Sequence, residues 1–267
     1  MNAPRHFHVD RPEFFHPALP KALDGFRIVY ISDLHVARGG CAEDELAHFL
    51  LSREYDLGLF GGDYQNGFGP VSEHAFGIIA RIVRAVRARH GVYGCVGNHD
   101  SPDVVARLKS ESIRMDENCS YEIAPGFHLV VIGDAWDRHD DVPLAMRDLP
   151  SSGFRMTLSH APDVAWKASR AGAHALLCGH THGGQVRLPF IDSPVKRIRG
   201  DRRLVRGDFR LDRMLLHVTH GFGTSLFAIR YGTRRSIAEV TLRHGELWKN
   251  AAPRIFSKET WRKLRSA

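Results

Sequence analysis

Predominantly apolar runs of six or seven residues recur through the first two-thirds of the chain, at 27–32, 56–62, 91–97, 154–159 and 174–179. Continuous apolar runs of this length, bounded by Gly and polar residues, are typical of strands buried on both faces of a sheet. The pattern therefore predicts five core strands. Each run leads within a residue or two into side chains that can bind a metal: Asp33 and His35, Asp63, Asn98, His160, and His180 and His182.

The segments between these runs have helical periodicity instead. Apolar residues recur at three- and four-residue spacing over 43–53 and 71–90, and Pro102 suits the first turn of a helix over 102–110. Another helix is predicted over 162–170, and further strands over 121–123, 128–132, 185–188, 215–219 and 236–242. Alternating strands and helices followed by strands predict an α/β fold in which two sheets pack face to face with helices outside.

The polar residues after the five runs should meet at one place. In open α/β sheets, functional groups collect at the carboxyl ends of the strands. Carboxylate, amide and imidazole donors without thiolates suit a hard-to-intermediate divalent ion. The sequence therefore predicts a metal site at the carboxyl ends of these strands.

The order of these residues resembles the calcineurin-like metallophosphoesterase superfamily. Its pattern runs D-x-H, GD, GNH(D/E), an isolated His and GHxH, and every block is present in order between Asp33 and His182. Small bacterial phosphodiesterases with a GHTHGGQ segment are still more similar, because 179–185 reads GHTHGGQ and 221–225 also matches them. His220 stands where these relatives usually carry Arg. The resemblance implies a four-layer α/β/β/α sandwich with two mixed sheets and a dinuclear metal site.

The resemblance also implies a ligand set. Asp63 would bridge two divalent ions, with Asp33, His35 and His182 completing the first shell and Asn98, His160 and His180 the second. Mn²⁺ is the favoured ion, and Fe, Zn²⁺ and Ni²⁺ accept the same donors. Two divalent ions outweigh two carboxylates and a bridging hydroxide, so the site would favour an anionic phosphate ester over a neutral one.

The implied reaction is attack of a metal-bridging hydroxide on phosphorus, with His99 as the general acid. Asp100 would either orient His99 or cap the following loop, and capping is the favoured interpretation. Gly183, Gly184 and Arg187 are candidate substrate-binding residues. For the two glycines, a tight turn without substrate contact explains the sequence equally well.

Composition agrees with one domain over residues 1–267, since 43% of the residues are hydrophobic. Residues 1–25 are expected to form an extended lead-in, and 250–267 a basic tail that docks on the domain or lies on a membrane surface. No apolar stretch reaches the roughly 20 residues of a membrane span, and the start lacks an apolar leader. With four unpaired-looking cysteines, we expect a cytoplasmic protein, with peripheral contact at the inner membrane as an alternative.

Positive charge is concentrated after the last ligand block. The net charge is +7, and residues 187–213 supply +5 of it through nine basic and four acidic side chains. This segment is either a solvated loop or a rim that steers an anionic substrate. A specific nucleic-acid partner is not indicated, because no aromatic residues interleave with the basic ones as a stacking groove requires. No protein partner is indicated either.

The sequence therefore predicts a metal-dependent hydrolase of a phosphodiester or pyrophosphate bond. A pyrophosphatase acting on UDP-2,3-diacylglucosamine in lipid A synthesis and a broad phosphomonoesterase remain alternatives. A non-catalytic scaffold is less favoured because no ligand of the pattern is lost. A nucleic-acid-binding protein is less favoured too, and a salt-steep DNA affinity would reveal one.

Overall fold

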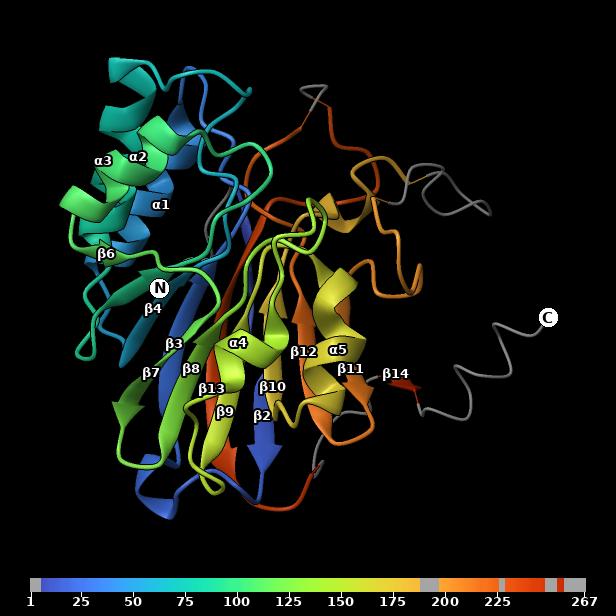
Figure 1. Cartoon of the computed structure of the whole chain (residues 1–267). Coiled ribbons are helices and arrows are strands. Elements are labelled where there is room, and N and C mark those ends of the chain that lie inside the picture. The colour runs from blue at the N-terminus through green and yellow to red at the C-terminus, as the bar shows by residue number, and fades with distance from the viewer. Residues whose placement is uncertain (1–5, 188–196, 226–228, 248–253, 257–267) are drawn as a thin grey trace.

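The computed structural model describes residues 6–187, 197–225, 229–247 and 254–256. Two mixed seven-stranded sheets pack face to face (Figure 1). The predicted α/β class with two mixed sheets is thus confirmed.

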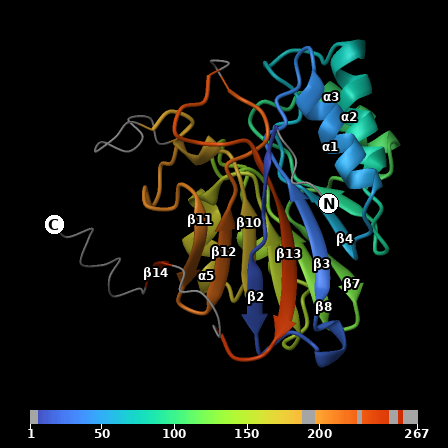
Figure 2. The ribbon, with the colours of Figure 1, turned by 180° about the vertical axis from the view of Figure 1, so that it is seen from behind.

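The first sheet has the order β1-β13-β3-β4-β5-β6, with β2 also paired to β13. Only β13 and β3 run antiparallel to each other, and all other pairs are parallel. Its strands are β1 (His8–Asp10), β2 (Glu13–His16), β3 (Phe26–Ile31), β4 (Leu57–Phe60), β5 (Val92–Gly94), β6 (Ile113–Arg114) and β13 (Ser236–His244). Figure 2 shows β2, β13 and β3 side by side.

The second sheet has the order β14-β11-β12-β10-β9-β8-β7. The strands β8, β9, β10 and β12 are parallel, and β7 and β11 pair antiparallel with β8 and β12. Its strands are β7 (Cys119–Ala124), β8 (Phe127–Val131), β9 (Phe154–Leu158), β10 (Ala175–Cys178), β11 (Gly207–Leu211), β12 (Met214–Val218) and β14 (Arg254–Phe256).

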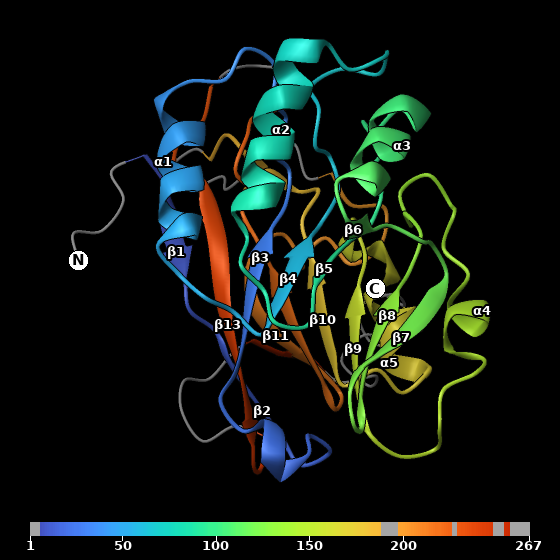
Figure 3. The same ribbon diagram turned by 90° about the vertical axis from the view of Figure 1, so that its left-hand side faces the viewer.

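Helices cover the outer face of each sheet. Figure 3 shows α1 (Cys41–Leu51), α2 (Glu73–Ala85) and α3 (Pro102–Ser110) over the first sheet. The short helices α4 (Val142–Met146) and α5 (Ala165–Arg170) cover the second sheet. Short 3₁₀ turns lie at η1 (Lys21–Leu23), η2 (Pro162–Val164) and η3 (His182–Gly184).

Side chains of the core strands alternate between two apolar clusters. In β3, Ile28 and Tyr30 pack between the two sheets, whereas Val29 and Ile31 pack beneath the helices. In β10, Leu177 packs between the sheets and its neighbours face the outer helix layer. This two-residue period explains why the central strands read as continuous apolar runs: both of their faces are buried. Because both faces are buried, the core strands are held in place by packing, and so are the polar residues at their carboxyl ends.

Most predicted elements are confirmed, and the differences have local causes. The helix predicted over 71–90 ends earlier, because Val86 is extended (φ −77°, ψ 110°) and Ala88 pairs with Tyr55. The strand predicted over 185–188 is wrong as far as the structure describes it, since Val186 makes only an isolated bridge to Tyr231. The lead-in is extended, but it joins the first sheet through β1 and β2.

Two expectations concern residues that the structure does not describe. Most of the basic tail predicted over 250–267 lies outside the described residues, with 254–256 described as β14, and part of the basic segment falls within 188–196. In the described part of the chain, none of the helices has the length and apolar character needed to cross a membrane.

Candidate metal centre

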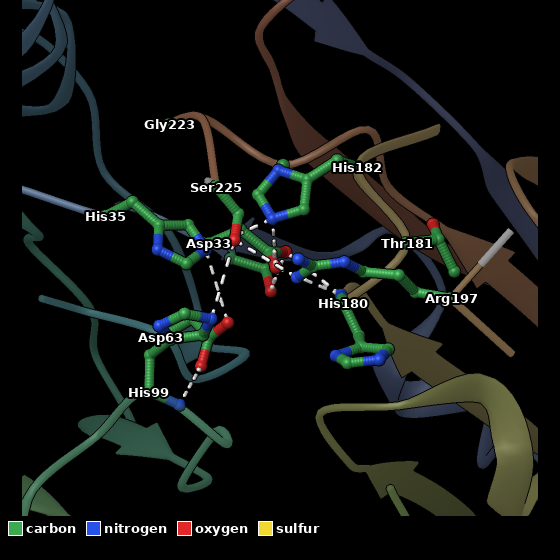
Figure 4. A network of polar contacts seen from close by, with 12 residues as sticks. Asp33, His35, Asp63, His99, His180, Thr181, His182, Arg197, Gly223 and Ser225 are labelled. Atoms are coloured by element: carbon green, nitrogen blue, oxygen red, sulfur yellow. Dashed lines mark hydrogen bonds and ion pairs between the residues drawn. The ribbon is translucent and has the colours of Figure 1, made fainter. Parts of the chain in front are cut away.

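The ends of five parallel strands meet at one edge of the molecule. Loops after β3, β4 and β5 carry Asp33, His35, Asp63, Asn98 and His99, and loops after β9 and β10 carry His160, His180 and His182. Figure 4 shows the side chains of Asp33, His35, Asp63 and His182 pointing toward one another. The convergence predicted from the sequence is therefore present in the structure.

The ligand loops have an unusual backbone. Asp33, Asp63 and His180 all have left-handed conformations, with φ of 56°, 56° and 65°. Non-glycine residues in this region cost roughly 1–3 kcal/mol and persist where the surroundings hold them, often at functional sites. Glycine is required beside them: a Cβ at Gly97 would lie 2.3 Å from Asp63 Oδ1, and one at Gly179 would lie 2.2 Å from Asp33 Oδ2.

A first group of donors consists of Asp33, His35, Asp63 and His182, all buried. The Nε2 atoms of His35 and His182 lie 3.1 Å apart. His35 Nε2 is 3.2 Å from Asp63 Oδ2, and His182 Nε2 is 3.5 Å from Asp33 Oδ1. The four donors thus surround one small space.

A second group consists of Asp63, His160 and His180, so Asp63 belongs to both groups. His160 Nε2 lies 3.4 Å from Asp63 Oδ2 and 3.0 Å from His180 Nδ1. It also lies 3.2 Å from Asn98 Oδ1, which places the amide oxygen beside this group. All seven residues predicted as ligands are therefore brought together.

The orientation of these side chains suits cations. Asp63 Oδ1 accepts a hydrogen bond from the backbone N–H of His99 at 2.8 Å, whereas buried Oδ2 has no hydrogen-bond partner. A buried carboxylate oxygen without a partner is costly unless a cation satisfies it. His160 Nδ1 lies 2.7 Å from the carbonyl of Gly61, which leaves Nε2 free to bind an ion. The donor set therefore fits two divalent ions that share Asp63.

The pKa shifts of three donors favour metal binding, whereas two shifts oppose it. Burial raises the pKa of Asp63, but the imidazoles of His160 and His35 outweigh this and hold it well below the usual value. Burial lowers the pKa of His180 and His182 well below the usual value. An ionised carboxylate and neutral imidazoles are the forms that bind metals. Burial raises the pKa of Asp33, and the pKa of His160, although lowered by burial, is held well above its usual value by the Asp63 carboxylate.

Asp33 is held in place by two neighbours. Ser32 Oγ donates to Asp33 Oδ2 at 2.7 Å, and the backbone N–H of His180 lies 3.1 Å from Oδ1. The carboxylate of one sheet is thereby fixed to the ligand loop of the other.

His99 lies beside the donors without belonging to either group. Its Nε2 is 3.4 Å from Ser225 Oγ, and its ring packs edge-on against His35 and face-on against Phe68. Burial lowers its pKa, although the Asp63 carboxylate opposes this. The imidazole therefore presents a nitrogen toward the site while its ring is fixed by packing.

Asp100 caps the adjoining loops. Its carboxylate accepts hydrogen bonds from the backbone N–H groups of Asp63, Tyr64 and Gly97 at 2.8, 2.7 and 2.8 Å. Burial and the nearby Asp63 carboxylate raise its pKa to about 7. These contacts correspond to the capping interpretation rather than to orientation of the His99 ring.

Three residues of the site were not singled out from the sequence as a unit. Gln185 clamps the backbone of Ser225 on both sides: its Nε2 donates to the carbonyl at 2.8 Å and its Oε1 accepts from the N–H at 3.0 Å. Arg197 Nη1 donates to Ser225 Oγ at 3.0 Å (Figure 4). Each of the three lies in a recognisable part of the sequence. Gln185 is the last residue of GHTHGGQ, Ser225 is the last residue of GFGTS at 221–225, and Arg197 belongs to the basic segment 187–213.

Two of the three predicted substrate-binding residues, Gly183 and Gly184, directly follow the ligand His182 in the chain. The N–H groups of Gly183 and Gly184 make hydrogen bonds to Thr181, within the turn that follows His180. Arg187 Nη1 donates to the carbonyl of Gly232 at 3.3 Å. Contact of these three residues with a substrate stays a prediction.

A half-buried arginine contacts His182. Arg230 Nη2 is 3.3 Å from His182 Nδ1 and donates to the carbonyls of Gly221 and Gly223, the former at 3.0 Å. Burial lowers the pKa of Arg230 to about 10. His220, for which the sequence left the role open, packs near Gly183, and burial lowers its pKa to about 4.

Comparison with known families agrees with this geometry. The profile of the family described as calcineurin-like phosphoesterase matches residues 26–184, which include every ligand of both groups. The chain therefore belongs to the calcineurin-like phosphoesterase family, as the motif order predicted.

Several known proteins are similar over most of their length. Phosphodiesterase YaeI of Escherichia coli (strain K12) is 30% identical over 231 residues, which cover 81% of this chain and 82% of YaeI. The uncharacterized metallophosphoesterase YkuE of Bacillus subtilis (strain 168) is 25% identical, covering 84% and 82%. UDP-2,3-diacylglucosamine pyrophosphatase LpxG of Chlamydia trachomatis is 22% identical, covering 77% and 81%.

Among solved structures, one described as "GAP50 the anchor in the inner membrane complex of Plasmodium" overlaps with a TM-score of 0.46 at 9% identity. The overlap covers 79% of this chain and 76% of that one.

Proposed function

We propose that this chain is a phosphodiesterase that depends on two divalent metal ions. The observation that carries this proposal is the buried Oδ2 of Asp63, which lacks a hydrogen-bond partner and lies between two sets of imidazoles. Family membership and the 30% identity to a phosphodiesterase support the same reaction class.

One ion would be held by Asp33, His35, Asp63 and His182, and the other by Asp63, Asn98, His160 and His180. Mn²⁺ is the proposed ion, with Fe, Zn²⁺ and Ni²⁺ as alternatives that accept the same donors. When bound, such a pair of ions supplies Lewis-acid polarisation of the phosphate and a water activated near neutral pH.

The chain's own residues would bind the anion and deliver a proton. Only two of the seven ligands are carboxylates, so the centre with two divalent ions bound would carry a net positive charge and would attract a phosphate ester. Arg197 adds a guanidinium beside Ser225, at the edge of the donor groups. His99 would donate a proton from Nε2 to the leaving oxygen, because that nitrogen faces the site and no ligand role occupies it.

The proposed bond is a phosphodiester. The similarity to a pyrophosphatase acting on UDP-2,3-diacylglucosamine keeps a pyrophosphate bond as the second candidate, at the lower identity of 22%. A broad phosphomonoesterase is the third.

The test is a substrate panel on protein stripped of metal and reloaded with each of the four ions. Bis(p-nitrophenyl) phosphate, p-nitrophenyl phosphate and a UDP-linked sugar represent the three bond types. His160→Asn removes a ligand of the second group, and His48→Asn, an exposed residue of α1, is the matched control. We expect diester hydrolysis that requires added metal, survives in His48→Asn and is lost in His160→Asn. Activity that persists without metal, or equally in His160→Asn, would contradict the proposal.

A further inference from the structure

Phe68 is an exposed aromatic residue in contact with the proposed proton donor. Its side chain is 70% exposed, and its ring stacks on the imidazole of His99 at a centroid distance of 4.3 Å and an angle of 21°. Since His99 covers one face of the phenyl ring and most of the residue is accessible, the other face is open to solvent. A flat apolar surface is thus presented next to the donor groups.

The loop that carries Phe68 is anchored to the metal loops. Buried Gln65, two residues after Asp63, closes the loop by donating from Nε2 to the carbonyl of Gly69 at 2.7 Å. The N–H of Asn66 donates to the carbonyl of Val36, next to His35, at 3.1 Å. Gly67, which directly precedes Phe68, has a φ of +100°, a backbone conformation that residues with a side chain rarely adopt. The position of Phe68 is therefore set by the same loops that position the ligands.

The contacts of His99 leave one edge of its ring directed at the site. Phe68 covers a face, His35 packs edge-on at 4.8 Å, and Nε2 lies 3.4 Å from Ser225 Oγ. A proton donor works at roughly 2.6–3.2 Å from the oxygen that it protonates. A group bonded to that oxygen can then extend past the edge of the stacked pair and reach the open face of Phe68.

We infer that Phe68, stacked on His99, forms a subsite for an aromatic ring carried by the leaving alcohol of the substrate. This inference rests on the proposed phosphodiesterase function and names its substrate class: phosphoesters whose leaving group bears a planar ring, as in a nucleoside or an aryl-substituted alcohol. Offset stacking on a phenyl face favours such a ring over an aliphatic group of the same size.

The test compares two symmetrical diesters, bis(2-phenylethyl) phosphate and bis(2-cyclohexylethyl) phosphate. Their alcohols have closely matched acidity, so both need the same help from a proton donor and differ in the ring alone. Wild type, Phe68→Leu and Phe68→Tyr are assayed with metal content measured, and Leu51→Ala, an exposed residue on α1, serves as control. Binding of the corresponding methylphosphonate monoesters, measured by calorimetry, supplies a readout that needs no turnover.

We expect wild type to prefer the phenyl compound by roughly tenfold in kcat/KM and in phosphonate affinity, in line with measured base–aromatic stacking. Phe68→Tyr and Leu51→Ala should keep this preference, and Phe68→Leu should lose it at unchanged metal content. Equal use of both compounds by wild type, or an undiminished preference in Phe68→Leu, would overturn the subsite. A Phe68-dependent preference in binding without turnover of either diester would support the subsite and contradict the proposed function instead.

Discussion

Asp63 and His99 are joined directly: the backbone N–H of His99 donates to Asp63 Oδ1 at 2.8 Å, and Oδ2 of the same carboxylate faces His35 and His160. One carboxylate therefore holds the loop that carries the proposed acid and presents its other oxygen to both donor groups. This arrangement connects the position of His99 to the geometry of the metal centre, because the loop cannot shift without moving Asp63.

The variant His99→Asn should keep both metal ions but hydrolyse diesters more slowly. The loss of rate should be larger for esters with a more basic leaving group. General acid catalysis contributes typically about 10²–10⁴-fold, and an alkoxide needs the full contribution. A nitrophenolate leaves with little help, so its release should slow much less. The measurement is kcat for bis(p-nitrophenyl) phosphate and for a dialkyl phosphate on both proteins. Equal losses for the two esters would mean that His99 positions the phosphate and does not donate a proton.

Arg197→Gln should raise KM for the diester and weaken its salt dependence, with kcat little changed. Arg197 is the basic residue whose guanidinium reaches Ser225 beside His99, and a charge-assisted contact to phosphate is worth about 1.5–3 kcal/mol, or roughly ten- to a hundredfold in affinity. Arg202, exposed in the same segment, is the matched control. Arg202→Gln should leave KM near the wild-type value. An identical response of KM to both substitutions would point to general electrostatic steering by the whole basic segment.

A histidine pair outside the site should make stability fall in acid. His16 on β2 and His174 before β10 have ring centroids 4.4 Å apart, and the Nδ1 of each accepts a backbone N–H at 3.0 Å. Burial lowers the pKa of His16 to about 3 and of His174 to about 4, from the usual value of 6.5. Unfolded imidazoles take up protons near 6.5 while the folded ones stay neutral, so stability is full above about pH 6.5 and declines toward pH 3.

The check is the melting temperature between pH 7 and pH 4. His174→Asn keeps an acceptor for the backbone N–H without a titrating group, so its melting temperature should fall less steeply with pH than that of wild type. His48→Asn on exposed α1 should show the wild-type slope. Parallel slopes for wild type and His174→Asn would exclude this pair as the cause.

The ends of the core strands could be predicted from the sequence. Because both faces of each strand are buried, each strand appears as a continuous apolar run, and the ligands follow directly after the run. Contacts between loops were not predictable. His99 and Ser225 are 126 positions apart, and their approach depends on how β5 of one sheet and the segment after β12 of the other are packed. Phe68 lies between two glycines in a segment without helical or strand periodicity. Its stacking on His99 therefore could not be predicted from the pattern of apolar and polar residues. The strand expected over 185–188 failed because Gln185 is used to hold Ser225 instead of extending a sheet.

The number of metal ions per chain in wild type, Asp63→Ala and Asp33→Ala tests the central claim most directly. Each protein is loaded with Mn²⁺, dialysed and analysed for bound metal, with circular dichroism used to confirm folding. Asp63 belongs to both donor groups and Asp33 to one. We predict two ions in wild type, about one in Asp33→Ala, and loss of both in Asp63→Ala. Two ions retained by folded Asp63→Ala would contradict a centre built on a shared Asp63.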